Sequence, residues 1–302
     1  MHAYLAAPER EAELLAELEF SKAQIVERHE RLLLAEGGPS NAAWASNIWY
    51  DVERLFIDSI GDGARQLQRR QRNWALYSVA HHRRAQLIRD KLPHVSAKPL
   101  EFGQRPPTAP LGSWTLLEPN QILASASCRS AFGNGEVEFV EDKLAPPSRA
   151  YLKLWEVFTL TGRQPVKGER CLDLGSSPGG WTYVLASLGA TVISVDKAPL
   201  APSVARMPNV QFRQQSAFAL EPEAFPKVDW LFSDVICYPT RLFETIARWR
   251  AQGNVRNFVC TLKFQGETDH ETARRFAALP GSQLVHLHHN RHELTWICLS
   301  AE

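Results

Sequence analysis

The chain has 302 residues, a formal net charge of +1 and 44% apolar residues. This length allows two domains of ~150 residues each, with ordinary hydrophobic cores. A net charge near zero excludes a protein that holds nucleic acid through its overall field, so any such binding needs a local basic patch. The five cysteines are scattered without a C-x-x-C pair, which favours reduced thiols over a disulfide framework or a metal site. No signal peptide or transmembrane run is visible, so we expect a cytoplasmic protein without a membrane partner.

The first half of the chain alternates short apolar runs with amphipathic segments, which predicts a small α+β domain. The expected strands are Ala3–Ala6, Arg31–Ala35, Trp44–Trp49 and Trp74–Val79. The expected helices are Glu9–Glu19, Asp62–Gln71 and His82–Leu92. A proline-rich connector over residues 103–112 precedes three further expected strands, which are Trp114–Leu117, Gln121–Ser127 and Glu136–Val140.

Basic side chains gather in and between the second and third of these helices. They are Arg65, Arg69, Arg70, Arg72, Arg83, Arg84, Arg89 and Lys91, interleaved with Trp74, Tyr77, His81 and His82. Arginine binds phosphate and, like an aromatic ring, stacks on bases. The cluster therefore predicts contact with RNA, and its main residues are expected to be Arg69, Arg70, Arg83 and Arg84. The alternative is that these are ordinary solvated helix faces.

The pattern changes after a hinge at Asp142–Pro147, which predicts two domains, residues 1–142 and residues 143–302. Ser148 is expected to cap a helix that reaches Leu160. The strands expected after it are Cys171–Leu174, Thr191–Asp196, Val210–Arg213, Asp229–Asp234 and Phe258–Phe264. The helices between and after them are Trp181–Leu188, Arg241–Gln252 and Asp269–Leu279, and a hairpin of Gln283–His288 and Leu294–Leu299 closes the chain. This order predicts an α/β, Rossmann-like doubly wound sheet with one antiparallel strand.

The segment Arg170–Lys197 joins a strand, a glycine-rich turn, a helix and a second strand that ends in Asp196. This is the order of a nucleotide-binding βαβ unit. Glycine lets the backbone approach a ligand, the helix N-terminus offers free N–H groups, and Asp196 can accept both hydroxyls of a ribose. A dinucleotide fingerprint needs a glycine at Ser177. Its absence favours a ligand with one ribose and no pyrophosphate, such as S-adenosylmethionine, and the alternative is a purely structural βαβ unit.

The reactive groups of such a sheet gather beyond the carboxyl ends of its strands. Asp234 follows the fourth strand, Lys263 ends the fifth and Glu293 begins the last, while Lys153 lies in the helix before the sheet. Most of them have an ordinary alternative, as an exposed helix lysine (Lys153), a hairpin charge (Glu293) or a helix cap (Asp234). Lys263 is harder to explain in this way, because it stands where an apolar residue would continue a buried strand.

Together and in this order, the four residues resemble the Lys-Asp-Lys-Glu tetrad of the FtsJ-like ribose 2′-O-methyltransferases. The resemblance covers Pro147–Leu299, and its motifs are Ala145–Glu156, Asp173–Tyr183, Ser194–Asp196, Leu262–Phe264 and Asn290–Leu294. It implies an S-adenosylmethionine-dependent enzyme that methylates a ribose 2′-hydroxyl of RNA, with large-subunit (23S) ribosomal RNA as substrate. In front of this region the similarity is faint, and it implies a reduced, ferredoxin- and THUMP-like RNA-binding domain over residues 1–142.

The resemblance also assigns site residues. The catalytic tetrad would be Lys153, Asp234, Lys263 and Glu293, in which Lys263 orients and deprotonates the hydroxyl. The cofactor would contact Asp173, Gly175, Ser176, Pro178, Gly179, Gly180, Trp181, Asp196, Ser216 and Asp234. Ser216 stands where the family often carries an aspartate that reads the adenine amino group. This chemistry requires no metal.

Two rival functions stay open beside this hypothesis. The first is an RNA-binding protein with an inactive methyltransferase fold, and the complete tetrad argues against it. The second is a nucleotide-dependent oxidoreductase, which the missing central glycine disfavours. We expect the protein to be a monomer.

Overall fold

The computed structural model describes residues 1–225 and 227–301. The chain divides into two compact units, Met1–Phe139 and Val140–Glu302, and the sequence places this division between residues 142 and 143. Each unit has sheets of its own. Among the described residues, no helix is both long enough and apolar enough to cross a membrane.

The first sheet of the N-terminal unit has the strand order β2-β3-β1-β4-β9, and neighbouring strands run antiparallel. Its strands are β1 (His2–Ala6), β2 (Gln24–His29), β3 (Leu32–Glu36), β4 (Ala45–Tyr50) and β9 (Ser127–Cys128). The helix α1 (Glu11–Phe20) connects β1 to β2. Leu14 and Leu18 of α1 are buried, because residues four apart lie on one face of a helix.

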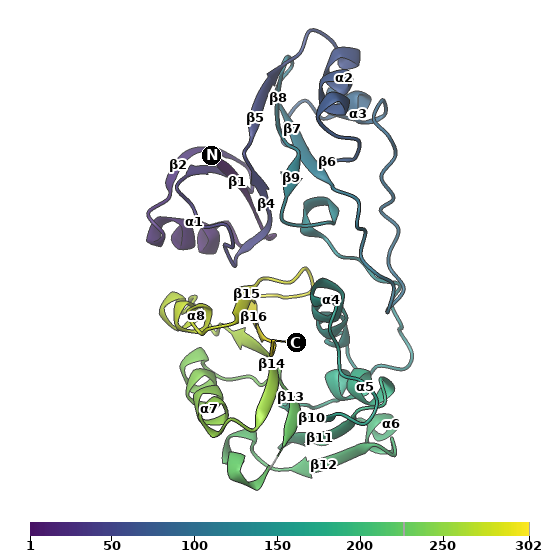
Figure 1. Ribbon diagram of the computed structural model, residues 1–302, viewed down its shortest axis with the longest axis vertical. Helices are drawn as coiled ribbons and strands as arrows, with labels where there is room; N and C mark the ends of the chain where they lie inside the picture. The colour runs from purple at the N-terminus through teal and green to yellow at the C-terminus, as the bar shows by residue number, and fades with distance from the viewer. Residues whose placement is uncertain (226, 302) are drawn as a thin grey trace. The chain divides into compact units, whose positions relative to one another are not determined.

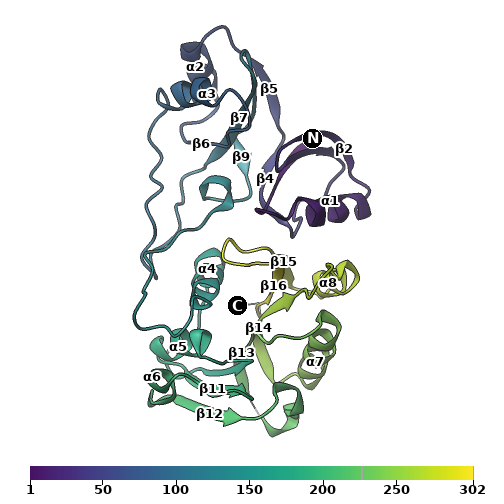
Figure 2. The ribbon, with the colours of Figure 1, turned by 180° about the vertical axis from the view of Figure 1, so that it is seen from behind.

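A four-stranded sheet with the order β5-β8-β7-β6 completes the N-terminal unit. Its strands are β5 (Glu53–Phe56), β6 (Trp74–Leu76), β7 (Gly112–Glu118) and β8 (Gln121–Ser125), and a 3-10 turn follows at Gly133–Gly135. The helices α2 (Ile60–Arg70) and α3 (His82–Arg89) lie side by side next to this sheet (Figure 2). Trp114 of β7 packs with the apolar faces of both helices in one core. The ferredoxin- and THUMP-like character of this unit stays a prediction.

The C-terminal unit is a seven-stranded sheet with the order β12-β11-β10-β13-β14-β16-β15. Its strands are β10 (Arg170–Leu174), β11 (Thr191–Asp196), β12 (Val210–Gln214), β13 (Val228–Ser233), β14 (Val255–Lys263), β15 (Ser282–Val285) and β16 (Glu293–Cys298). Its helices are α4 (Tyr151–Thr161), α5 (Gly180–Ser187), α6 (Pro202–Ala205), α7 (Pro239–Gln252) and α8 (His270–Ala277), with 3-10 turns at Ala217–Ala219 and Pro222–Ala224. Figure 1 shows α4, α5 and α6 on one face of the sheet and α7 and α8 on the other.

The strand order positions the site. β10 pairs with β11 on one side and with β13 on the other, all parallel, so the chain winds away from β10 in both directions. Such a switch leaves a crevice beyond the carboxyl ends of the two strands. All six residues of β13 are buried, as expected for a central strand covered on both faces. Because β16 runs antiparallel to both β14 and β15, the doubly wound sheet with one antiparallel strand is confirmed.

Two expectations about elements are wrong. Glu136–Val140 is not a strand, because within it only Phe139 pairs, through an isolated bridge to Leu100; the adjoining Pro99 has no N–H with which to extend a ladder. Ser148 does not cap a helix, since α4 begins at Tyr151 and the residue at the capping position is Ala150.

The sequence reading also misses the strands β2 and β5. Both lie at the edge of a sheet, and charged side chains are common on edge strands because they block pairing with other chains. The charged residues of Gln24–His29 and Glu53–Phe56 therefore weaken the apolar signal by which a strand is recognised.

Candidate active site

The glycine-rich turn lies between β10 and α5, at the crevice. Gly175 has φ +74°, and a Cβ atom added to it would come within 2.5 Å of the Cα atom of Val235. Only glycine therefore lets this turn pass so close to the segment that follows β13. The N–H groups of Gly175 and Ser176 both donate to the carbonyl of Val195, which fixes the turn against the end of β11.

Asp173 is a fully buried carboxylate at the base of this turn. Its Oδ2 atom accepts a hydrogen bond of 2.6 Å from the Thr182 hydroxyl, but its Oδ1 atom has no partner within the described residues. Burial raises the pKa of Asp173 to about 7, against the hydrogen bond from Thr182, and the negative charges of Asp234 and Asp196 add to the rise. A buried acceptor without a partner is costly, so this group is prepared for a donor from a ligand.

A cleft lies over the turn and reaches the end of β13. It is lined by Ser148, Ala150, Asp173, Gly175, Ser176, Ser177, Pro178, Gly180, Trp181 and Asp234. Most of the expected cofactor residues are among them, whereas Gly179, Asp196 and Ser216 are not. Ser148, Ala150 and Ser177 line the cleft without being among the expected cofactor residues. The hydroxyls of Ser148 and Ser176 are buried and, like Asp173 Oδ1, have no partner among the described residues.

Asp196 and Ser216 lie farther along the same edge of the sheet. Asp196 ends β11, and its two oxygens accept the N–H groups of Ser177 and Ala198, each at 2.9 Å. Ser216 follows β12, the strand that pairs with β11. The Asp196 carboxylate thus lies against the turn, and each of its oxygens keeps a lone pair for a further donor. Their contact with a cofactor stays a prediction.

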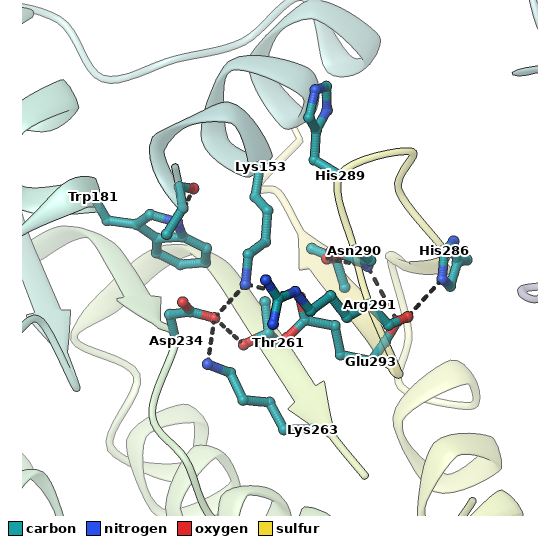
Figure 3. A network of polar contacts seen from close by, with 12 residues as sticks. Lys153, Trp181, Asp234, Thr261, Lys263, His286, His289, Asn290, Arg291 and Glu293 are labelled. Carbon is teal, nitrogen blue, oxygen red and sulfur yellow. Dashed lines mark hydrogen bonds and ion pairs between the residues drawn. The ribbon is translucent and has the colours of Figure 1, made fainter. Parts of the chain in front are cut away.

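The tetrad residues come from four separate elements and meet beside this cleft (Figure 3). Lys153 lies on α4, Asp234 follows β13, Lys263 ends β14 and Glu293 begins β16. In the antiparallel pair of β14 and β16, Lys263 lies directly opposite Glu293. Asp234 is held at the end of β10, where its N–H donates to the carbonyl of Leu174. It does not cap α7, whose capping position is Tyr238.

Asp234 is the centre of the polar network. Its Oδ1 atom lies 2.9 Å from the Nζ atom of Lys153 and 3.0 Å from that of Lys263. The same oxygen accepts a 2.6 Å hydrogen bond from the hydroxyl of Thr261, a residue that the sequence reading misses. Thr261 and Lys263 are two residues apart on β14 and therefore lie on one face of the strand, and this spacing is the only signal for Thr261 in the sequence.

The two lysines of the network have different surroundings. Lys153 contacts a second carboxylate, because its Nζ atom lies 2.8 Å from Oε1 of Glu293. Burial lowers the pKa of Lys153, but the attraction of Asp234 and Glu293 outweighs it, and the pKa lies above its usual range. Burial likewise raises the pKa of Asp234, and the two lysines together with Thr261 reverse this to a net decrease. Lys153 is thus held as a cation and Asp234 as an anion.

The basic side chains of α2 and α3 divide into two groups. Arg70 forms an ion pair of 2.9 Å with Glu53, and Arg84 donates to the carbonyl of Pro119. Arg69 and Arg83 are exposed, and within residues 1–225 and 227–301 neither forms an ion pair. They are therefore available to bind an anion, as is Arg89 of α3, which is also exposed. In the same described residues there is no group of three or more His, Cys, Asp or Glu side chains placed to hold a metal ion.

Residues 146–274 match the model of the FtsJ-like methyltransferase family. This matched region is called the FtsJ-like domain below. The matched region carries the glycine-rich turn and Lys153, Asp234 and Lys263 of the tetrad, and Glu293 lies beyond it. The α/β fold with a mixed sheet, which β15 and β16 complete beyond the matched region, agrees with this match to a methyltransferase family.

The curated proteins similar to this chain resemble about half of it. The ribosomal RNA large subunit methyltransferase M of Halorhodospira halophila (strain DSM 244 / SL1) is 34% identical over 159 residues, which are 49% of this chain and 46% of that protein. Its namesake in Marinomonas sp. (strain MWYL1) is 31% identical over 195 residues, which are 59% of this chain and 54% of that protein. Among solved structures, TrmN from Thermus thermophilus has 14% identity and a TM-score of 0.37, and the match covers 99% of each chain. The chain spans about half the length of the curated relatives it matches.

Proposed function

We propose that this protein transfers the methyl group of S-adenosylmethionine to a ribose 2′-hydroxyl of RNA, and that its substrate is large-subunit (23S) ribosomal RNA. The observation that carries the proposal is the network in which Asp234 links Lys153 to Lys263 at the edge of the cleft. The printed names of the curated relatives, ribosomal RNA large subunit methyltransferases, support the class of substrate.

The residues of the cleft fit S-adenosylmethionine. Asp173 Oδ1 and the hydroxyls of Ser148 and Ser176 are buried without partners in the described chain, and they suit the ammonium and carboxylate groups of an amino acid. Asp196 would bind the ribose hydroxyls, and Ser216 would accept from the adenine amino group. When bound, the cofactor supplies an electrophilic methyl group and the positive charge of its sulfonium.

Lys263 is the base in this mechanism. Because Asp234 and Glu293 hold Lys153 in its protonated form, Lys153 is suited to orient the hydroxyl and not to remove its proton. Lys263 pairs with Oδ1 of Asp234, an oxygen that Lys153 and Thr261 also contact. Its amine would take the proton as the ribose oxygen attacks.

The N-terminal unit, which we interpret as a reduced THUMP-like domain, would supply RNA affinity through α2 and α3. Arg69 and Arg83 are exposed there and have no ion pair in the described part of the chain, and arginine contacts with phosphate strengthen binding to any RNA sequence. Recognition of the ribosomal RNA would thus be divided between a basic surface in one unit and a catalytic network in the other.

The rival reading, an RNA-binding protein with an inactive methyltransferase fold, is not favoured because the tetrad is complete and connected. Incubating the protein with labelled S-adenosylmethionine and total RNA tests the two directly. Label in RNA from the wild type but not from Lys263→Ala supports the enzyme, and absence of transfer by the wild type contradicts it. Mapping of 2′-O-methyl sites in cells with and without the protein then identifies the nucleotide.

A further inference from the structure

A second carboxylate on α4 is buried beside the tetrad. Glu156 is 1% exposed, and it accepts three hydrogen bonds from one short stretch of chain. Its Oε1 atom binds the N–H of His288 at 2.7 Å, and its Oε2 atom binds the N–H of His289 at 3.1 Å and Nδ1 of that ring at 2.7 Å. Burying a carboxylate is costly unless it is bound in this way, so the three donors account for its position.

Those donors belong to the connection between β15 and β16, residues 286–292, which leads directly into Glu293. Glu156 lies three residues after Lys153, so both side chains lie on the same face of α4. That face therefore contacts the connection twice: Glu156 binds its middle, and Lys153 binds Glu293 at its end, at 2.8 Å.

Hydrogen bonds within the chain segment 286–295 hold the connection together (Figure 3). The side-chain amide of Asn290 donates to the carbonyl of Glu293 and to the hydroxyl of Thr295. Nε2 of His286 donates to the carbonyl of Arg291 at 2.9 Å. Because these bonds stiffen the connection, a displacement of His288 and His289 would also move Glu293.

We propose that Glu156 is a positioning residue for methyl transfer: by holding residues 288 and 289 against α4, it keeps the Glu293 carboxylate in contact with Lys153. The inference rests on the proposed function of the tetrad, and it adds a residue that acts through Glu293 without touching the substrate. A misplacement of about 1 Å in such a network can lower a rate by about 100-fold.

The test separates positioning from a role in stability alone. Glu156→Gln keeps the size of the side chain but turns one acceptor into a donor that faces an N–H group. We expect the single-turnover rate of methyl transfer to RNA to fall about 10- to 100-fold, while the dissociation constant of S-adenosylhomocysteine changes less than about twofold. Introduced into a Glu293→Gln protein, the same change should lower the residual rate less than about threefold, because its effect passes through Glu293. A rate equal to that of the wild type, or the same loss in both backgrounds, overturns the proposal.

Glu169→Gln is the matched control. Glu169 also holds chain segments together, accepting from the N–H of Val166 and from Nε1 of Trp230, but it precedes β10, at the opposite end of the strand from the cleft. Its substitution should lower stability without lowering the rate of transfer. If Glu156→Gln does not fold, His289→Ala takes its place, with an expected loss of about 3- to 10-fold that again nearly vanishes beside Glu293→Gln.

An additional readout does not depend on catalysis. Hydrogen exchange of peptides covering residues 286–293 should be faster in Glu156→Gln than in the wild type, and unchanged exchange counts against the clamp. If the wild type transfers no methyl group, the proposed function fails whatever the exchange shows. If the wild type is active and Glu156→Gln is equally active, the inference alone fails.

Discussion

The glycine-rich turn and the tetrad adjoin the same cleft, but they are built in different ways. Most residues that line the cleft come from one contiguous segment, Asp173–Trp181, which contains the turn. The tetrad combines residues from α4, β14, β16 and the segment after β13 that are up to 140 positions apart, from Lys153 to Glu293. A local segment can thus form a binding surface, whereas the catalytic network exists only when sheet and helix are assembled. Variants of the turn should therefore change cofactor binding, and variants of the tetrad should change the rate of transfer.

The largest expected effect is that of Lys263→Ala. Loss of a general base lowers a rate by ~10²–10⁴-fold, and the affinity for S-adenosylhomocysteine should stay nearly constant because Lys263 acts in the transition state. Lys263→Arg should be almost as harmful, since a guanidinium stays protonated. Single-turnover transfer to RNA and calorimetry measure the two quantities. Near-normal rates in the arginine variant would reduce Lys263 to a positioning charge.

The next effect concerns the turn and depends on pH. The pKa of Asp173 is raised to about 7 from its ordinary 3.8. Between these values the folded protein binds more protons at this site than the unfolded chain, so the free energy of unfolding falls as the pH rises. An asparagine at this position does not titrate. Asp173→Asn should therefore remove this fall in the free energy of unfolding, which is of the order of a few kcal/mol over the range. Urea unfolding at several pH values measures it, and parallel curves for variant and wild type would exclude Asp173 as the cause.

Asp196→Ala tests the contribution of the β11 end to cofactor binding. Unpaired polar groups cost ~1–3 kcal/mol, so the affinity for S-adenosylhomocysteine should fall by that amount in calorimetry. The rate with saturating cofactor should change little, because Asp196 lies apart from the tetrad. Asp196→Asn keeps an acceptor and should lose less. An unchanged dissociation constant in the alanine variant would remove Asp196 from the site.

The smallest effect is expected outside the FtsJ-like domain. Replacing Arg69 and Arg83 by glutamine should weaken RNA binding and lower the salt slope by ~0.7–0.9 for each phosphate that the protein no longer neutralises. Binding of S-adenosylhomocysteine should not change. Lys22 and Lys98, which are also exposed, provide a control pair with the same change in charge. Equal salt slopes for the two double variants would show that the arginines form only a solvated surface.

The sequence alone determined the parts that depend on local pattern. Apolar runs of strand length marked β10, β11, β13 and β14, and glycines after a strand marked the turn, because both follow from backbone conformation and burial within a few residues. Lys263 was recognisable because a charge at the end of a buried strand is costly without a partner. The edge strands β2 and β5 were missed, since their charged residues hide the same pattern.

Only the tertiary structure decided which side chains meet. The register of β14 and β16 places Lys263 opposite Glu293, and the packing of α4 brings Glu293 to Lys153 and the β15–β16 connection to Glu156. The bend of the chain before Tyr151 turns Ser148 into the cleft and not onto the helix end. No spacing in the sequence encodes these contacts, because a hydrogen bond depends on positions within a few tenths of an ångström, and these are fixed by packing between elements far apart in the chain.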